Sequence, residues 1–137
     1  MTDHFQLSDA EFEEQFAAGA FPPKLFTHEA HLRLAWIHLR KYGLEQAIRN
    51  VTDQLQQFVQ MIGAEDKFHM TLSVAAVKAV YHFMGRATSP DFRGLLEEFP
   101  ALRDQFRELI DAHYGADRLN SPAARSTFLE PDRLPFP

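Results

Sequence analysis

Two histidines in the stretch "FTHEAHLRLAWIHL" have a spacing that suits metal chemistry. His28 and His31 are three residues apart, so on a helix their rings lie on one face and can reach one point in space. His69 stands at the expected start of another helix and would close a site of three nitrogens if the two helix starts meet. Three neutral imidazoles plus water is a known zinc arrangement, and imidazole also binds iron and nickel. The sequence therefore predicts a divalent-metal site at His28, His31 and His69. Asp66 is a candidate for a fourth ligand, and the alternative interpretation, a solvated loop charge, fits it better.

The residues beside these histidines suggest a pocket around the metal. Phe26 and Phe68 would keep water out and lower the local dielectric, and Thr71 could bind a ligand by a hydrogen bond. A bound metal would then activate water or hold an oxygen ligand. Two alternatives stay open at this point. The histidines could be structural, satisfied by ordinary hydrogen bonds, or they could form a ligand or acid/base site without metal.

The other histidines are expected to be less involved. His38 and His82 fall in the middle of helices, where we expect partial exposure. His4 is expected in a mobile N-terminus. His113 should lie at the C-terminal end of a helix, where an imidazolium is favoured.

The composition excludes several classes of function. The 137 residues contain no cysteine, which rules out disulfides, cysteine-ligated clusters and a thiolate nucleophile. No glycine-rich phosphate loop, nucleophile elbow or H-E-x-x-H motif is present, and the repeated Glu-x-x-His pairs of di-iron bundles are missing. The net charge of −5 argues against nucleic-acid binding, which needs a basic surface. Without a signal core or a membrane-length apolar run, the chain is expected in the cytoplasm and off the membrane.

The elements that must position the histidines are all predicted to be helices. Ser8 and Glu11 form a capping-box signature, and apolar residues recur at the helical period through most of the chain. The segment from Thr71 to Tyr81 is rich in β-branched residues, but its length and alanines favour a helix over a strand. The four main helices are predicted at 8–19, 27–43, 44–62 and 71–84, with shorter ones at 89–98, 100–115 and from Ser121. The fold class is an all-α, single-domain bundle over residues 1–137.

The two ends are expected to differ from the bundle. Residues 1–7 should be mobile. Residues 128–137 carry three prolines and should form an extended tail. Because Phe128, Leu134 and Phe136 are spaced along this tail, we expect it to pack on the helices.

Three motifs resemble those of a family of small, uncharacterised, all-α bacterial proteins. They are "FTHEAHLRLAW", "GAEDKFHMT" and "SPAARSTFLEPDRLPFP", and the resemblance spans residues 26–137. It implies that His28, His31 and His69 belong to the family pattern, but it brings no reaction with it. In the related sequences the residue after the third histidine is often glutamate. Here the residue is Met70. If the glutamate acts as a metal ligand or a base in those sequences, this chain lacks that group.

The sequence thus leads to one function and one alternative. The leading prediction is a small cytoplasmic helical protein whose histidine-lined pocket binds a divalent metal or a small ligand, with zinc, iron or nickel as the metal. Whether it is an enzyme stays open. The alternative is a non-catalytic interaction or structural protein, such as a homodimer, with structural histidines.

Overall fold

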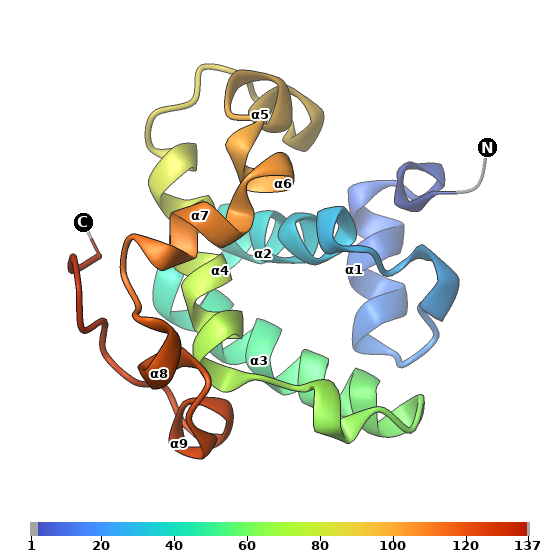
Figure 1. Ribbon diagram of the computed structural model, residues 1–137. Coiled ribbons are helices and arrows are strands. Elements are labelled where there is room, and N and C mark those ends of the chain that lie inside the picture. Colours follow the sequence, from blue (N-terminus) through green and yellow to red (C-terminus); the bar gives the residue numbers. More distant parts are fainter. Residues whose placement is uncertain (1–2, 137) are drawn as a thin grey trace. The chain divides into compact units, whose positions relative to one another are not determined.

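The computed structural model describes residues 3–136, and within them every regular element is helical (Figure 1). The all-α prediction is confirmed, including a helix where a strand was the alternative. The helices are α1 (Asp9–Ala17), α2 (His28–Tyr42), α3 (Leu44–Met61), α4 (Met70–Met84), α5 (Phe92–Glu98), α6 (Ala101–Asp104), α7 (Phe106–Asp111), α8 (Ala116–Leu119) and α9 (Pro122–Ser126). Short 3₁₀ turns occupy His4–Gln6, Pro23–Leu25 and Glu65–Lys67. In the described part of the chain, no helix is both long and apolar enough to span a membrane.

The chain divides into two compact units, Met1–Phe68 and His69–Pro137. Each unit has a buried apolar centre of its own. The predicted single domain over residues 1–137 stays a prediction.

Local signals set most helix ends in the first unit. The capping box at the start of α1 is confirmed: Ser8 Oγ accepts from the Glu11 amide at 3.1 Å, and the Glu11 carboxylate accepts from the Ser8 amide at 2.9 Å. Thr27 caps α2 as predicted, its hydroxyl accepting from Ala30 N at 3.2 Å. Gly43 separates α2 from α3 with a φ of 82°, a conformation that favours glycine.

Some predicted boundaries in the second unit are wrong. The helix predicted from Thr71 begins at Met70 and is capped by His69, whose Nδ1 accepts from Leu72 N at 3.0 Å. The helix predicted over 89–98 begins at Phe92, after its cap Asp91. The predicted helix over 100–115 is broken at Gln105, whose ψ of 34° separates α6 from α7.

Phenylalanine rings form the centre of the first unit. They come from α1, from the loop before α2 and from α3, which runs beside α2 (Figure 1). Ring centroids of Phe12 and Phe21 are 4.6 Å apart, and those of Phe16 and Phe58 are 5.1 Å apart. Phe26 lies 5.0 Å from Phe58. These distances are typical of packed aromatic pairs, which explains why this small chain uses so many phenylalanines.

The centre of the second unit joins α4 to the helices that follow it. Its fully buried members are Ala75, Ile110, Tyr114 and Leu119, and Phe136 from the tail packs against them. The extended tail is therefore held against the helices, as the sequence predicts. Leu134 is the exception, because 63% of it is exposed, so the expectation that it packs is wrong.

Thr71 fastens the tail to α4 through one buried hydroxyl. Its single hydroxyl proton is shared between the carbonyl oxygens of Ala124 (2.7 Å) and Thr127 (3.0 Å), and its Oγ1 accepts from Leu129 N (3.2 Å). Thr71, which the sequence predicts to bind a ligand, is buried, and its hydroxyl already has hydrogen-bond partners inside its own unit.

Thr71→Val keeps the shape of this side chain but removes the hydroxyl. We expect a loss of about 2–3 kcal/mol in the free energy of unfolding, because buried backbone groups lose their partner. Urea denaturation followed by circular dichroism measures this loss, and faster hydrogen exchange at the Leu129 amide localises it. Thr127→Val is the matched control, since the Thr127 side chain is exposed. Equal stability of the two variants would contradict the assigned role.

Candidate functional site

The first turns of α2 carry the two histidines that the sequence pairs. His28 is the first residue of the helix and is exposed, and His31 follows one turn later. The predicted helical spacing is therefore confirmed, and the charge of His28 acts on His31. Phe26, just before the helix, packs its ring 5.8 Å from the His31 ring, as expected for a flanking aromatic residue.

His31 has an unusual environment for an imidazole. Its Nε2 is shut off from solvent and has no hydrogen-bond partner among residues 3–136. Burial, assisted by the charge of His28, lowers its pKa from 6.5 to about 4. At neutral pH the ring is therefore uncharged, which is the form that binds metal.

The other predicted ligands lie at the boundary of the two units. Asp66 is exposed in the turn Glu65–Lys67, and Phe68, half-buried, ends the first unit. His69 begins the second unit. Convergence of His69 with His28 and His31 stays a prediction.

His69 is already engaged inside the second unit. Its Nδ1 accepts from Leu72 N, and its Nε2 donates to the carbonyl oxygen of Leu119 at 2.8 Å. A neutral imidazole with one donor and one acceptor is satisfied by these two bonds. Metal ligation by His69 would require one of them to break.

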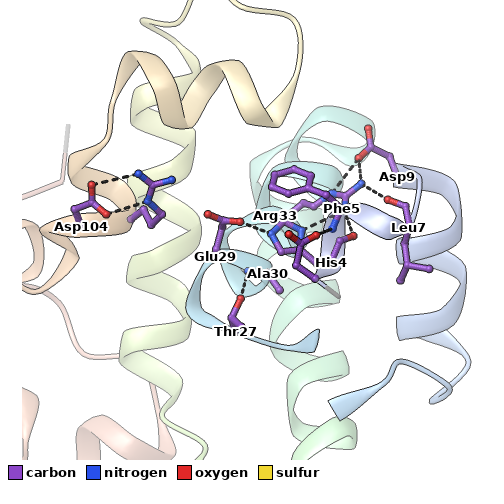
Figure 2. Close-up of polar contacts among 11 residues, drawn as sticks. His4, Phe5, Leu7, Asp9, Thr27, Glu29, Ala30, Arg33 and Asp104 are labelled. Atoms are coloured by element: carbon purple, nitrogen blue, oxygen red, sulfur yellow. Dashed lines mark hydrogen bonds and ion pairs between the residues drawn. The ribbon is translucent and has the colours of Figure 1, made fainter. Parts of the chain in front are cut away.

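A network at the N-terminus, which the sequence did not predict, surrounds Arg33 (Figure 2). Its Nη1 donates to the carbonyl oxygen of His4 at 2.6 Å, and its Nη2 donates to the carbonyl oxygen of Leu7 at 2.8 Å. The same Nη2 donates to the Asp9 carboxylate at 2.9 Å. One guanidinium thus contacts two backbone carbonyls of the segment before α1 and the first residue of α1 itself.

His4 belongs to this network and is buried, with 1% exposure. Its Nδ1 faces Arg33 Nη1 at 3.2 Å, and because arginine can only donate, the proton of His4 sits on Nε2. This Nε2 donates to the Glu29 carboxylate at 2.6 Å. Burial lowers the pKa of His4, and Glu29 offsets part of that effect. His4 is thus buried and hydrogen-bonded, while the mobility predicted for residues 1–7 stays a prediction and residues 1–2 lie outside the described residues.

His38 is also buried, which differs from its prediction. It was expected to be partly exposed, but 1% of it is exposed. Its Nδ1 accepts from the Asn50 amide at 3.3 Å, and its Nε2 is buried without a partner in the described chain. Burial lowers its pKa. The position of His38 one residue before Leu39, on a helix apolar nearly all round, was the available signal.

The second unit contains a cavity of about 200 Å³ that the sequence did not reveal. Lys78 and His82 border it from α4, and His113 borders it from beyond α7. His113 was expected to support a helix end. Instead its Nδ1 donates to the carbonyl oxygen of Leu134 in the tail at 2.8 Å. The four-residue spacing of Lys78 and His82 was the available signal, but it does not reveal a cavity.

The described residues and the comparisons with known proteins add two findings. Over residues 3–136, no group of three or more histidine, aspartate or glutamate side chains is arranged to hold a metal ion. The chain matches no protein-family model, and no curated protein or solved structure gives a significant match to it.

Proposed function

We propose that this protein is a cytoplasmic metal-binding protein that holds a divalent transition-metal ion through His28 and His31 of α2. One observation carries the proposal: the Nε2 of His31 is buried without a partner, one helical turn from a second imidazole. A buried nitrogen without a hydrogen bond costs about 1–3 kcal/mol, and coordination to a metal would remove that cost.

The chemistry of the two side chains fits a borderline metal such as zinc, iron(II) or nickel. Both are neutral nitrogen donors when deprotonated, and the lowered pKa of His31 keeps it so at neutral pH. The positive end of the α2 dipole opposes a cation by about 0.3–1 kcal/mol. This opposition is small compared with the free energy of metal coordination. With two protein ligands, a bound metal would keep positions for water or for an oxygen ligand, and it would supply Lewis-acid chemistry there.

A metal titration of thermal stability tests the proposal. Protein stripped with a chelator should melt at a higher temperature when zinc, iron(II) or nickel is added. The expected gain is about 2.7 kcal/mol at a free metal concentration near 100 times Kd. His28→Ala should abolish the rise while leaving the metal-free melt nearly unchanged, because His28 is exposed. His31→Ala should abolish the rise as well.

His38→Ala is the matched control for this experiment. His38 is another buried histidine of α2 with a partnerless Nε2, so its loss should lower the metal-free melt but leave the metal-dependent rise intact. The proposal fails if no metal raises the midpoint, or if the rise survives in His28→Ala and His31→Ala. His69→Ala in the same titration tests the third ligand that the sequence predicts. The alternative of a non-catalytic homodimer stays a prediction.

A further inference from the structure

Lys78 brings a positive charge to the rim of the cavity in the second unit. Lys78 is half-buried, and among the described residues no carboxylate pairs with it. Its Nζ lies instead 5.1 Å from the ring centroid of Phe136 and 5.4 Å from that of Phe128. Contacts with ring faces stabilise an ammonium group only modestly, so Lys78 keeps its capacity to bind an anion.

Two imidazoles stand on the same cavity as Lys78. His82 is four residues after Lys78 on α4, so both side chains lie on one helix face. His113 faces them from beyond α7, with its ring 4.5 Å from that of Phe136. Nδ1 of His113 donates to a carbonyl oxygen, so in the neutral ring Nε2 can only accept a hydrogen bond from a ligand. None of the described residues that line the cavity is acidic.

The rest of the lining is apolar, and the volume limits the size of the ligand. Phe83 of α4 and Leu109 and Ile110 of α7 supply the apolar wall. A cavity of about 150 Å³ can hold benzene. The 200 Å³ available here therefore suits one aromatic ring or a short branched chain, with little room beyond it.

The tail borders the cavity through Phe136 and is held there by backbone hydrogen bonds. Arg133 N donates to the carbonyl oxygen of His113 at 2.9 Å, and Leu134 N donates to that of Ala112 at 3.2 Å. These bonds bring Phe136 onto the cavity, where it also contacts the buried centre of the unit. Leu134 is thus held to the helices by its backbone amide, while its side chain is exposed.

We propose that this cavity binds a small amphipathic monocarboxylate that carries a single aromatic ring or a short branched chain. The carboxylate lies at the Lys78 ammonium group, which is the charged donor on this cavity among the described residues. The apolar body lies against Phe83, Leu109 and Ile110. The site belongs to the second unit and does not depend on the metal proposed for α2.

Calorimetric titration with phenylacetate, in chelator so that no metal contributes, tests this proposal. We expect saturable binding with a Kd of about 1 mM or tighter, which is reasonable for a ligand of this size. Phenylacetamide has the same ring without the charge, and acetate has the charge without the ring. Each should bind roughly tenfold more weakly, since each lacks one half of the recognition.

Lys78→Met, which keeps the apolar stem, should weaken phenylacetate roughly tenfold and leave phenylacetamide unchanged. Lys67→Met is the matched control, because Lys67 is exposed and lies in the first unit, and it should bind like wild type. Circular dichroism checks that each variant is folded. If Lys78→Met does not fold, Ala79→Leu keeps the charge, fills the cavity and should abolish binding. The proposal is overturned by equal affinity for phenylacetate and phenylacetamide, by binding that survives Lys78→Met or Ala79→Leu, or by no saturable binding.

Discussion

Replacing Arg33 with methionine is expected to lower the free energy of unfolding of the first unit by about 3–5 kcal/mol. Arg33 is 4% exposed and donates to two backbone carbonyl oxygens and to Asp9. Its guanidinium also lies 5.0 Å from the ring centroid of Phe12. Methionine fills similar space but leaves the carbonyls of His4 and Leu7 without their donor.

The loss is measured by urea denaturation with tryptophan fluorescence as the probe. Trp36 is the single tryptophan of the chain and is buried in α2, so its emission reports on the first unit. Arg33→Lys keeps the charge but lacks the planar fork, and we expect it to recover less than half of the loss.

Arg49→Met serves as the matched control for Arg33. Arg49 lies in the same unit on α3, is exposed and donates to the Gln46 side chain of its own helix, so the expected change is within about 0.5 kcal/mol. A loss below about 1 kcal/mol in Arg33→Met would show that the N-terminal segment does not depend on this side chain.

The metal-free first unit is expected to lose stability as pH falls from about 6.5 to about 4. His31 has its pKa lowered to about 4 in the folded protein by burial and by His28, whereas it titrates near 6.5 when unfolded. Between these values the unfolded chain binds the proton and the folded unit does not. The stability due to neutral His31 is therefore complete above pH 6.5, is lost progressively toward pH 4, and changes no further below it.

The size of this effect follows from the same pKa values. One pKa unit corresponds to about 1.4 kcal/mol, so His31 contributes up to about 3 kcal/mol. His4 and His38, whose pKa values are also lowered by burial, act in the same direction. Urea midpoints from Trp36 fluorescence, recorded in chelator across this pH range, measure the slope.

His31→Leu should flatten the pH dependence, because it removes one titrating group. A change in slope must be separated from simple destabilisation, and Leu55→Ala provides that control. Leu55 is buried on α3, and its truncation should lower stability by about 2–5 kcal/mol at every pH without changing the slope. The same slope in His31→Leu as in wild type would show that His31 is not the acid-sensitive group.

The sequence alone determined the features that depend on neighbouring residues. Ser8 and Glu11 are three residues apart, and Thr27 is three residues before the amide it caps, so both caps could be predicted from spacing. The apolar period gave the helices of both units and placed His28 and His31 on one face. These features follow from backbone geometry within a few residues, which the chemistry of those residues controls.

Only the tertiary structure decided what the histidines do. Arg33 meets His4 across 29 residues, and His69 reaches Leu119 across 50, so neither contact leaves a local pattern in the sequence. Contacts between residues far apart in the sequence also produce three other features. They are the burial of His38, the hydrogen bonds between Thr71 and the tail, and the cavity at Lys78. Whether an imidazole binds a ligand, satisfies a backbone group or stays buried without a partner depends on atoms brought near by packing. Helical periodicity fixes the face of the helix on which a side chain lies, but it does not determine which distant residue that face will meet.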